Sequence, residues 1–125
     1  CIPVFRGAVD DVLLRYVQAA RSVNARYVVR ATADNPLTDI DAPERMLRAL
    51  RETGADHVVE DGLPYGAAVE AVTVDALRRA AIQATEADDR EHVTPLIRRD
   101  RSRYTALTLP APRGLQRPDL RVTID

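Results

Sequence analysis

Residues 26–37 read RYVVRATADNPL, a run of β-forming side chains that leads directly into an acidic turn. Residues 26–32 are rich in β-branched and aromatic types and predict a short strand, and the Asn-Pro pair that ends residues 33–36 predicts a turn. In an open α/β sheet the ligand crevice lies beyond the carboxyl ends of the strands, so we expect Asp34 to face a ligand. An Asp before Asn-Pro is also a common turn former, and turn statistics alone favour that simpler interpretation.

The segments around this stretch alternate between helix and strand patterns. Apolar residues at helical spacing, with Asp10 as the expected N-cap, predict the first helix, and Pro43 and Gly54 mark both ends of the second. The predicted helices are residues 10–23, 41–52, 74–85 and 89–97, the last bent at Pro95; the predicted strands are residues 26–32, 55–60, 68–73, 104–109 and 120–124. This order predicts a single domain, residues 1–125, with an α/β sheet sandwich that is parallel at its centre.

Composition excludes several classes of protein. The chain has 125 residues, 18 basic against 19 acidic side chains and 46% hydrophobic content, which fits one globular domain and gives no broad positive field for nucleic acid. No stretch approaches the roughly 18 apolar residues of a membrane span, and the single Cys1 forms no internal disulfide. We therefore expect a soluble, cytoplasmic protein.

All of the basic residues are Arg, so any cation that this chain offers to a phosphate or a carboxylate is a guanidinium. The most specific polar cluster is Arg90, Glu91 and His92, three adjacent ionisable residues that cannot all point to solvent or all to the core. An exposed helix N-terminus is the alternative interpretation of this cluster. His57 has no evident partner in the sequence, and we expect it to be structural.

Five blocks along the chain carry a family resemblance. They are residues 4–7 (VFRG), 10–16 (DDVLLRY), 28–37 (VVRATADNPL), 90–95 (REHVTP) and 117–125 (RPDLRVTID). In this order they resemble the spore coat polysaccharide biosynthesis protein F family, which is similar to the cytidylyltransferases that activate 3-deoxy-manno-octulosonate and sialic acids. The resemblance implies a Rossmann-like nucleotide-diphospho-sugar transferase fold with a mixed, mostly parallel sheet. It also implies CTP and a sugar or sugar acid as substrates, magnesium as cofactor, and a homodimer as a possible assembly.

The resemblance assigns a role to each candidate site residue. Asp34 and Asp125 match the two carboxylates that bind magnesium and serve catalysis. The residues expected on the sugar side of the pocket are Glu70, Arg90, Glu91 and His92. Asp11 and Arg15 match the part of the first helix that approaches the nucleotide, although a surface ion pair four residues apart explains their spacing equally well.

The sequence departs from the family pattern in two places. The family opens with a strand and an arginine-, serine- and glycine-containing loop that ends in lysine and wraps the CTP phosphates, and neither is present, so we expect an N-terminally truncated domain. Ala68 stands where the family typically has aspartate. Two alternatives stay open: a catalytically silent fragment or sugar-binding module of the same fold, and a nucleotide-sugar glycosyltransferase. The latter class usually places two aspartates one residue apart, which Thr32 and Asp34 do not supply.

Overall fold

A computed structural model describes residues 1–124 of the chain. Its elements in chain order are α1 (Val12–Ser22), β1 (Tyr27–Arg30), α2 (Ala42–Thr53), β2 (His57–Asp61), β3 (Glu70–Thr73), α3 (Val74–Gln83), α4 (Ala87–His92), α5 (Pro95–Arg99), β4 (Ala106–Pro110) and the 3₁₀ turn η1 (Arg113–Leu115). The alternation of helices and strands that the sequence predicts is confirmed. None of the described helices combines the length and the apolar character needed to cross a lipid bilayer.

The four strands form one mixed sheet in the order β1-β3-β2-β4. β2 and β4 are parallel, whereas β3 is antiparallel to both β1 and β2. Three strands therefore point the same way and only β3 is reversed. The expected parallel pairing at the centre is wrong, because residues 62–69 return the chain from β2 to β3 without the crossover helix that a parallel pair requires.

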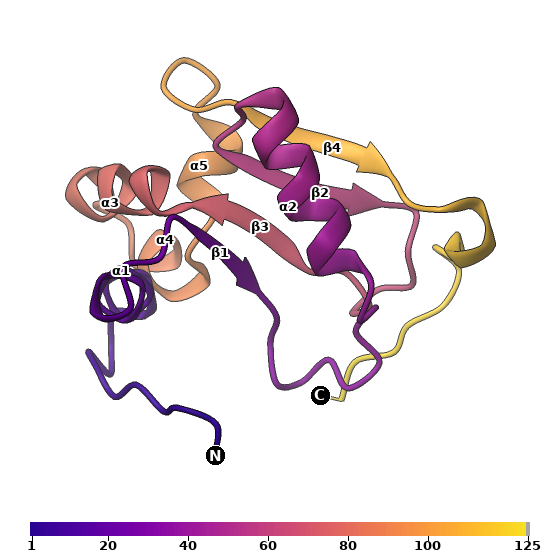
Figure 1. Cartoon of the computed structure of the whole chain (residues 1–125), viewed down its shortest axis with the longest axis horizontal. Helices are drawn as coiled ribbons and strands as arrows, with labels where there is room; N and C mark the ends of the chain where they lie inside the picture. Colours follow the sequence, from indigo (N-terminus) through magenta and orange to yellow (C-terminus); the bar gives the residue numbers. More distant parts are fainter. Residues whose placement is uncertain (125) are drawn as a thin grey trace.

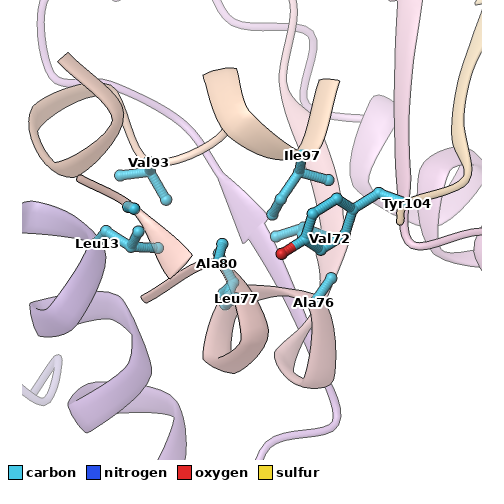
Figure 2. Packing of buried hydrophobic residues seen from close by; sticks show 9 residues of the cluster. Leu13, Val72, Ala76, Leu77, Ala80, Val93, Ile97 and Tyr104 are labelled. Atoms are coloured by element: carbon cyan, nitrogen blue, oxygen red, sulfur yellow. The ribbon is translucent and has the colours of Figure 1, made fainter. Parts of the chain in front are cut away.

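Helices cover both faces of this sheet (Figure 1). α2 packs on one face, where Met46 and Leu50 contact a cluster that includes Val58 and Ala71. α1, α3, α4 and α5 gather on the other face around a second cluster of buried residues, most of which Figure 2 shows in close-up. Successive residues of a strand point to opposite faces, so Ala71 belongs to the first cluster and its neighbour Val72 to the second.

The helix ends follow local sequence signals where such signals exist. α2 has Pro43 in its first turn, and Gly54 ends it in the left-handed conformation with φ 68°, as predicted. α1 is capped by Asp11, whose side chain accepts a hydrogen bond from the Leu14 N–H, and not by Asp10 as the sequence suggested. Asp11 is thereby fixed at the start of α1.

Two predicted elements differ in the structure. The single helix expected over residues 89–97 is two helices, α4 and α5, and the chain breaks at Val93 rather than bending at Pro95. The segment 120–124 was expected to be a closing strand. Within the described residues it has only an isolated parallel bridge, which pairs Arg121 with Tyr65. The backbone N–H of Val122 donates to the Tyr65 carbonyl, so this segment pairs with the loop between β2 and β3 rather than with the sheet.

Candidate functional site

A cleft of about 540 Å³ opens at the edge of the sheet where β1 and β2 end. Because β3 is reversed, its first residue, Glu70, lies at the same edge, opposite Arg30 and Val59. The side chains that line the cleft include Arg30, Thr32, Asp34, Asn35, Glu60, Tyr65, Ala68, Glu70, His92, Arg98 and Thr123. The predicted acidic turn thus lies at a ligand-sized opening beyond the strand ends.

Asp34 is exposed in a turn that holds its carboxyl toward the cleft. The Asn35 N–H donates to the Thr32 carbonyl at 3.1 Å, and the Asn35 side-chain amide donates to Thr32 Oγ1 at 2.8 Å. A hydrogen bond from the Thr32 side chain and one from the Asp34 backbone lower the pKa of Asp34 below its ordinary value; desolvation opposes them and the charge of Arg30 adds to them. Asp34 therefore presents an ionised, accessible carboxylate at neutral pH.

The C-terminal segment returns to this turn (Figure 1). The Ile124 N–H donates to the Asp34 carbonyl at 2.8 Å, which joins two residues that are far apart in the sequence. Asp125, the predicted partner of Asp34, follows Ile124 in the chain and lies outside the described residues. Among residues 1–124, no three His, Cys, Asp or Glu side chains are grouped closely enough to hold a metal ion.

Gly66 allows the C-terminal segment to approach. Its φ of +96° is a conformation that L side chains rarely adopt, and a Cβ there would collide with Thr123 Cγ2 and lie 3.0 Å from Asn35 Oδ1. Only glycine fits this position without displacing one wall of the cleft. The sequence gave no sign of this contact.

Glu70 is held by three protein donors. Its Oε2 accepts from Thr94 Oγ1 at 2.6 Å and from His57 Nε2 at 2.8 Å, and its Oε1 lies 3.4 Å from the Arg30 guanidinium. Burial raises the pKa of Glu70, but the hydrogen bonds from His57 and Thr94 and the nearby Arg30 charge outweigh burial, and the net pKa is lowered. His57, for which the sequence offered no partner, is 1% exposed and has Glu70 as that partner.

The predicted cluster of Arg90, Glu91 and His92 is divided by the structure. These residues end α4 rather than open a helix, so the exposed N-terminus interpretation is wrong, whereas their expected role on the sugar side of the pocket stays a prediction. His92 lines the cleft with its side chain 57% exposed. Arg90 is not among the lining residues: its guanidinium donates to Asp11 Oδ2 at 2.6 Å and to the Ala84 carbonyl at 2.8 Å. Glu91 is exposed and also outside the lining.

Asp11 and Arg15 also separate. Asp11 caps α1 and binds Arg90, so its carboxylate is occupied by protein groups. Arg15 lines a second cavity of about 390 Å³ beside the end of β1, together with Phe5 and Tyr16. This cavity shares Arg30 and Thr32 with the cleft. A nucleotide-binding role remains a prediction for both residues, with Arg15 the better placed.

Arg98 is one of the lining residues that the sequence did not single out. It lies in α5 with an exposed side chain, and within residues 1–124 its guanidinium has no hydrogen bond or ion pair. By contrast, Glu60 is bound at both oxygens by Arg45, at 2.8 Å each. One Arg among 18 carries no local signal that distinguishes it, because its place depends on how α5 packs against the sheet.

Comparisons with known proteins agree with this architecture. The model of the cytidylyltransferase family matches residues 2–124. An uncharacterized protein of Methanocaldococcus jannaschii is 36% identical over 124 residues, and the spore coat polysaccharide biosynthesis protein SpsF of Bacillus subtilis is 35% identical over 123 residues. These alignments cover 99% and 98% of this chain and 51% of each relative, so the chain spans about half the length of the curated relatives it matches.

The solved structure of a cytidylyltransferase from Leptospira borgpetersenii serovar Hardjo-bovis has the same fold. It superposes with a TM-score of 0.85 at 26% identity, over 98% of this chain and 52% of that one. The resemblance inferred from the five sequence blocks, and the mixed α/β fold that it implied, are confirmed. The chain belongs to the cytidylyltransferase family.

Proposed function

We propose that this chain forms the metal- and sugar-binding part of a CTP-dependent nucleotidyltransferase, which transfers CMP to a sugar for polysaccharide biosynthesis. Family membership supports a nucleotidyl transfer, and the Bacillus subtilis relative is a spore coat polysaccharide biosynthesis protein. The observation that carries the proposal is the acidic turn of Asp34, which opens on a cleft at the carboxyl ends of β1 and β2.

The residues at this turn fit a magnesium ion. Magnesium takes oxygen ligands, keeps several waters and needs only one or two carboxylates besides the substrate phosphates. Asp34 supplies one ionised carboxylate, and Asp125, which follows Ile124, would supply the second. When bound, magnesium would offset negative charge on the phosphate oxygens of CTP. Asp34 would thereby help to orient the α-phosphate toward the sugar hydroxyl.

The opposite wall of the cleft suits an acidic sugar. Arg98 offers an exposed guanidinium without a protein partner among the described residues, and His92 lies on the same lining. A guanidinium can hold a carboxylate through two parallel hydrogen bonds, which gives both affinity and orientation. We therefore assign the acid-binding role to Arg98 rather than to Arg90, the arginine that was expected on the sugar side of the pocket. Ala68 lies in the same lining, so the aspartate that the family typically has there would have faced the sugar.

Pyrophosphate release tests this proposal. The complete gene product that contains this chain is incubated with magnesium, one of CTP, UTP, ATP or GTP, and a panel of acidic keto-sugars and neutral sugars. We expect release with CTP and an acidic sugar, and formation of the CMP-sugar by mass spectrometry. Release with another nucleotide would refute the cytidylyl assignment. Absence of release under every condition would favour a catalytically silent member of the family.

A further inference from the structure

We propose that Glu70 is a positioning residue that joins the two walls of the cleft, and not a ligand of the sugar as the family resemblance suggested. The contacts of Glu70 do not depend on the proposed function, whereas the expected effect on sugar binding rests on it. Glu70 is the first residue of β3, and its side chain is only 16% exposed. Through that one carboxylate, the loop after β1 and the helices α4 and α5 share a partly buried anchor.

The first link runs to the wall that carries Asp34. Arg30 is the last residue of β1 and lies opposite Glu70 in the sheet register, with its guanidinium 3.4 Å from Glu70 Oε1. The Asp34 turn begins two residues after Arg30. Arg30 also places its charge near Asp34, where it helps to keep that carboxyl ionised. Glu70 therefore holds the base of the proposed metal-binding turn.

The second link runs to the wall that carries His92 and Arg98. Thr94 Oγ1 donates to Glu70 Oε2 at 2.6 Å, and its own carbonyl accepts the Arg98 N–H at 3.0 Å in the first turn of α5. The Thr94 N–H donates to the His92 carbonyl at 2.9 Å. Thr94 is thus bonded, through its backbone, to both cleft-lining residues of this wall.

The turn between His92 and Thr94 is strained. Val93 has φ 75° and ψ −52°, which with the bond from Thr94 to His92 makes a γ-turn of the rare positive-φ form. A β-branched residue in this region persists only where its surroundings hold it in place. Here the Val93 side chain is 1% exposed within the core cluster of Figure 2.

Two sets of hydrogen bonds hold this turn. Arg99 of α5 binds both oxygens of the buried Asp89 of α4, at 2.6 Å each, which fixes the two helices on either side of Val93. The bond from Thr94 to Glu70 then fixes the turn against the sheet. Without the Glu70 bond, α4 and α5 would still be joined on either side of the strained turn. The turn would no longer be fixed against the sheet, and His92 would lose its defined position in the cleft.

The occupied oxygens of Glu70 argue against a direct role with the sugar. An ionised carboxylate only accepts hydrogen bonds, so His57 Nε2 carries the proton toward Glu70. Oε2 already accepts from His57 and Thr94, so a sugar hydroxyl would have to compete there, and at Oε1 it would have to approach beside the Arg30 guanidinium. Positioning of the walls is therefore the role that these contacts support.

Two threonine variants test the positioning role. Thr94→Val removes the hydroxyl at nearly constant volume, and Thr94→Ser keeps it. The chain has two His residues, so the ring resonances of His92 and His57 are readily assigned by NMR. We expect T94V to move the His92 ring resonance and T94S to leave it near the wild-type position. Thr85→Val, an exposed threonine after α3, is the matched control and should move neither signal.

Kinetics on the complete gene product supply the second readout. We expect T94V to raise KM for the sugar by about tenfold, the size that loss of a hydrogen bond to a charged group gives, with a smaller effect on kcat and recovery in T94S. If Glu70 were a sugar ligand, Glu70→Gln would raise KM while T94V would leave it unchanged, and that result would overturn the inference.

Misfolding of T94V and failure of the proposed function can each be distinguished from failure of the positioning role. If T94V does not fold, Glu70→Leu still tests the link, because it removes both acceptor oxygens, and a wild-type His92 resonance in that variant would overturn the inference. If the complete protein releases no pyrophosphate, the proposed function fails, whereas the NMR comparison still decides whether Glu70 and Thr94 position His92.

Discussion

Arg98 and Arg90 show how a single contact decides the role of a side chain. The family resemblance placed Arg90 on the sugar side of the pocket, yet Asp11 and the Ala84 carbonyl occupy its guanidinium. Arg98 faces the cleft without a partner within residues 1–124. We expect Arg98→Gln to raise KM for an acidic sugar by about 10- to 100-fold, because a charge-assisted pair is lost. Steady-state kinetics with a neutral sugar as second substrate, and with the control variant Arg113→Gln, would separate this effect from a general loss of positive charge. Arg113 is an exposed residue of η1. An unchanged KM would remove Arg98 from the acid-binding site.

Glu70 makes a pH-dependent contribution to stability. Its folded-state pKa is lowered from the ordinary value of 4.5 by the hydrogen bonds from His57 and Thr94, which outweigh burial. A lowered carboxyl pKa stabilises the fold above the unfolded-state value, and this contribution is lost as pH falls through the folded-state value. We expect Glu70→Gln to be less stable than wild type at pH 7, with the difference shrinking below pH 4.5. Urea unfolding across pH measures it, with Glu52→Gln on the exposed face of α2 as control. A difference that grows at acid pH would contradict this account.

At the scale of elements, the loop between β2 and β3 shapes the cleft through Gly66. We expect Gly66→Ala to lower the free energy of unfolding by about 1–3 kcal/mol, because φ is positive and the new Cβ meets Thr123 and Asn35. The same substitution at Gly114, where no heavy atom lies within 4 Å of the new Cβ, should be nearly neutral. Urea denaturation of both variants checks the prediction. Equal effects at the two glycines would mean that the approach of residues 121–123 does not depend on Gly66.

Element boundaries were predictable where the chain carries local signals. Pro43 and Gly54 marked α2 correctly, and the alternating patterns placed the helices and strands in order. The break at Val93 was not predictable, since nothing in a valine signals a positive φ and the turn depends on contacts from Glu70 and from the core. The reversed β3 and the pairing of residues 120–124 with Tyr65 were missed for the same reason: strand direction and partner are set by distant segments.

At the scale of the whole molecule, the sheet is stabilised by an apolar cluster on each face. Leu77 of α3 is fully buried in the cluster of Figure 2, whereas Ile82 on the same helix is 85% exposed. We expect Leu77→Ala to lower the free energy of unfolding by about 2–5 kcal/mol through lost contacts and a cavity, and Ile82→Ala to change it by less than about 0.5 kcal/mol. Chemical denaturation of the two variants measures the difference. Similar values would mean that α3 does not pack as described.

The candidate site was predictable only in part. Asp34 was accessible to sequence reasoning because a strand followed by an acidic turn is a local pattern, and its place at the cleft agrees with that reasoning. Arg98, Thr94 and the occupied state of Glu70 were not accessible, because they arise where α4 and α5 meet the far side of the sheet. Asp125 keeps the role that the family resemblance gave it as a prediction.

The central claim, that Asp34 at the sheet edge binds magnesium for cytidylyl transfer, is tested most directly by one comparison. Pyrophosphate release from CTP is measured against magnesium concentration for the complete wild-type gene product and for Asp34→Asn, with circular dichroism and the thermal midpoint as checks of folding. Because Asp34 is exposed and its Asn replacement keeps the size of the side chain, we expect an unchanged fold. We also expect loss of magnesium-dependent release in the variant. Wild-type release and wild-type magnesium dependence in Asp34→Asn would contradict the account.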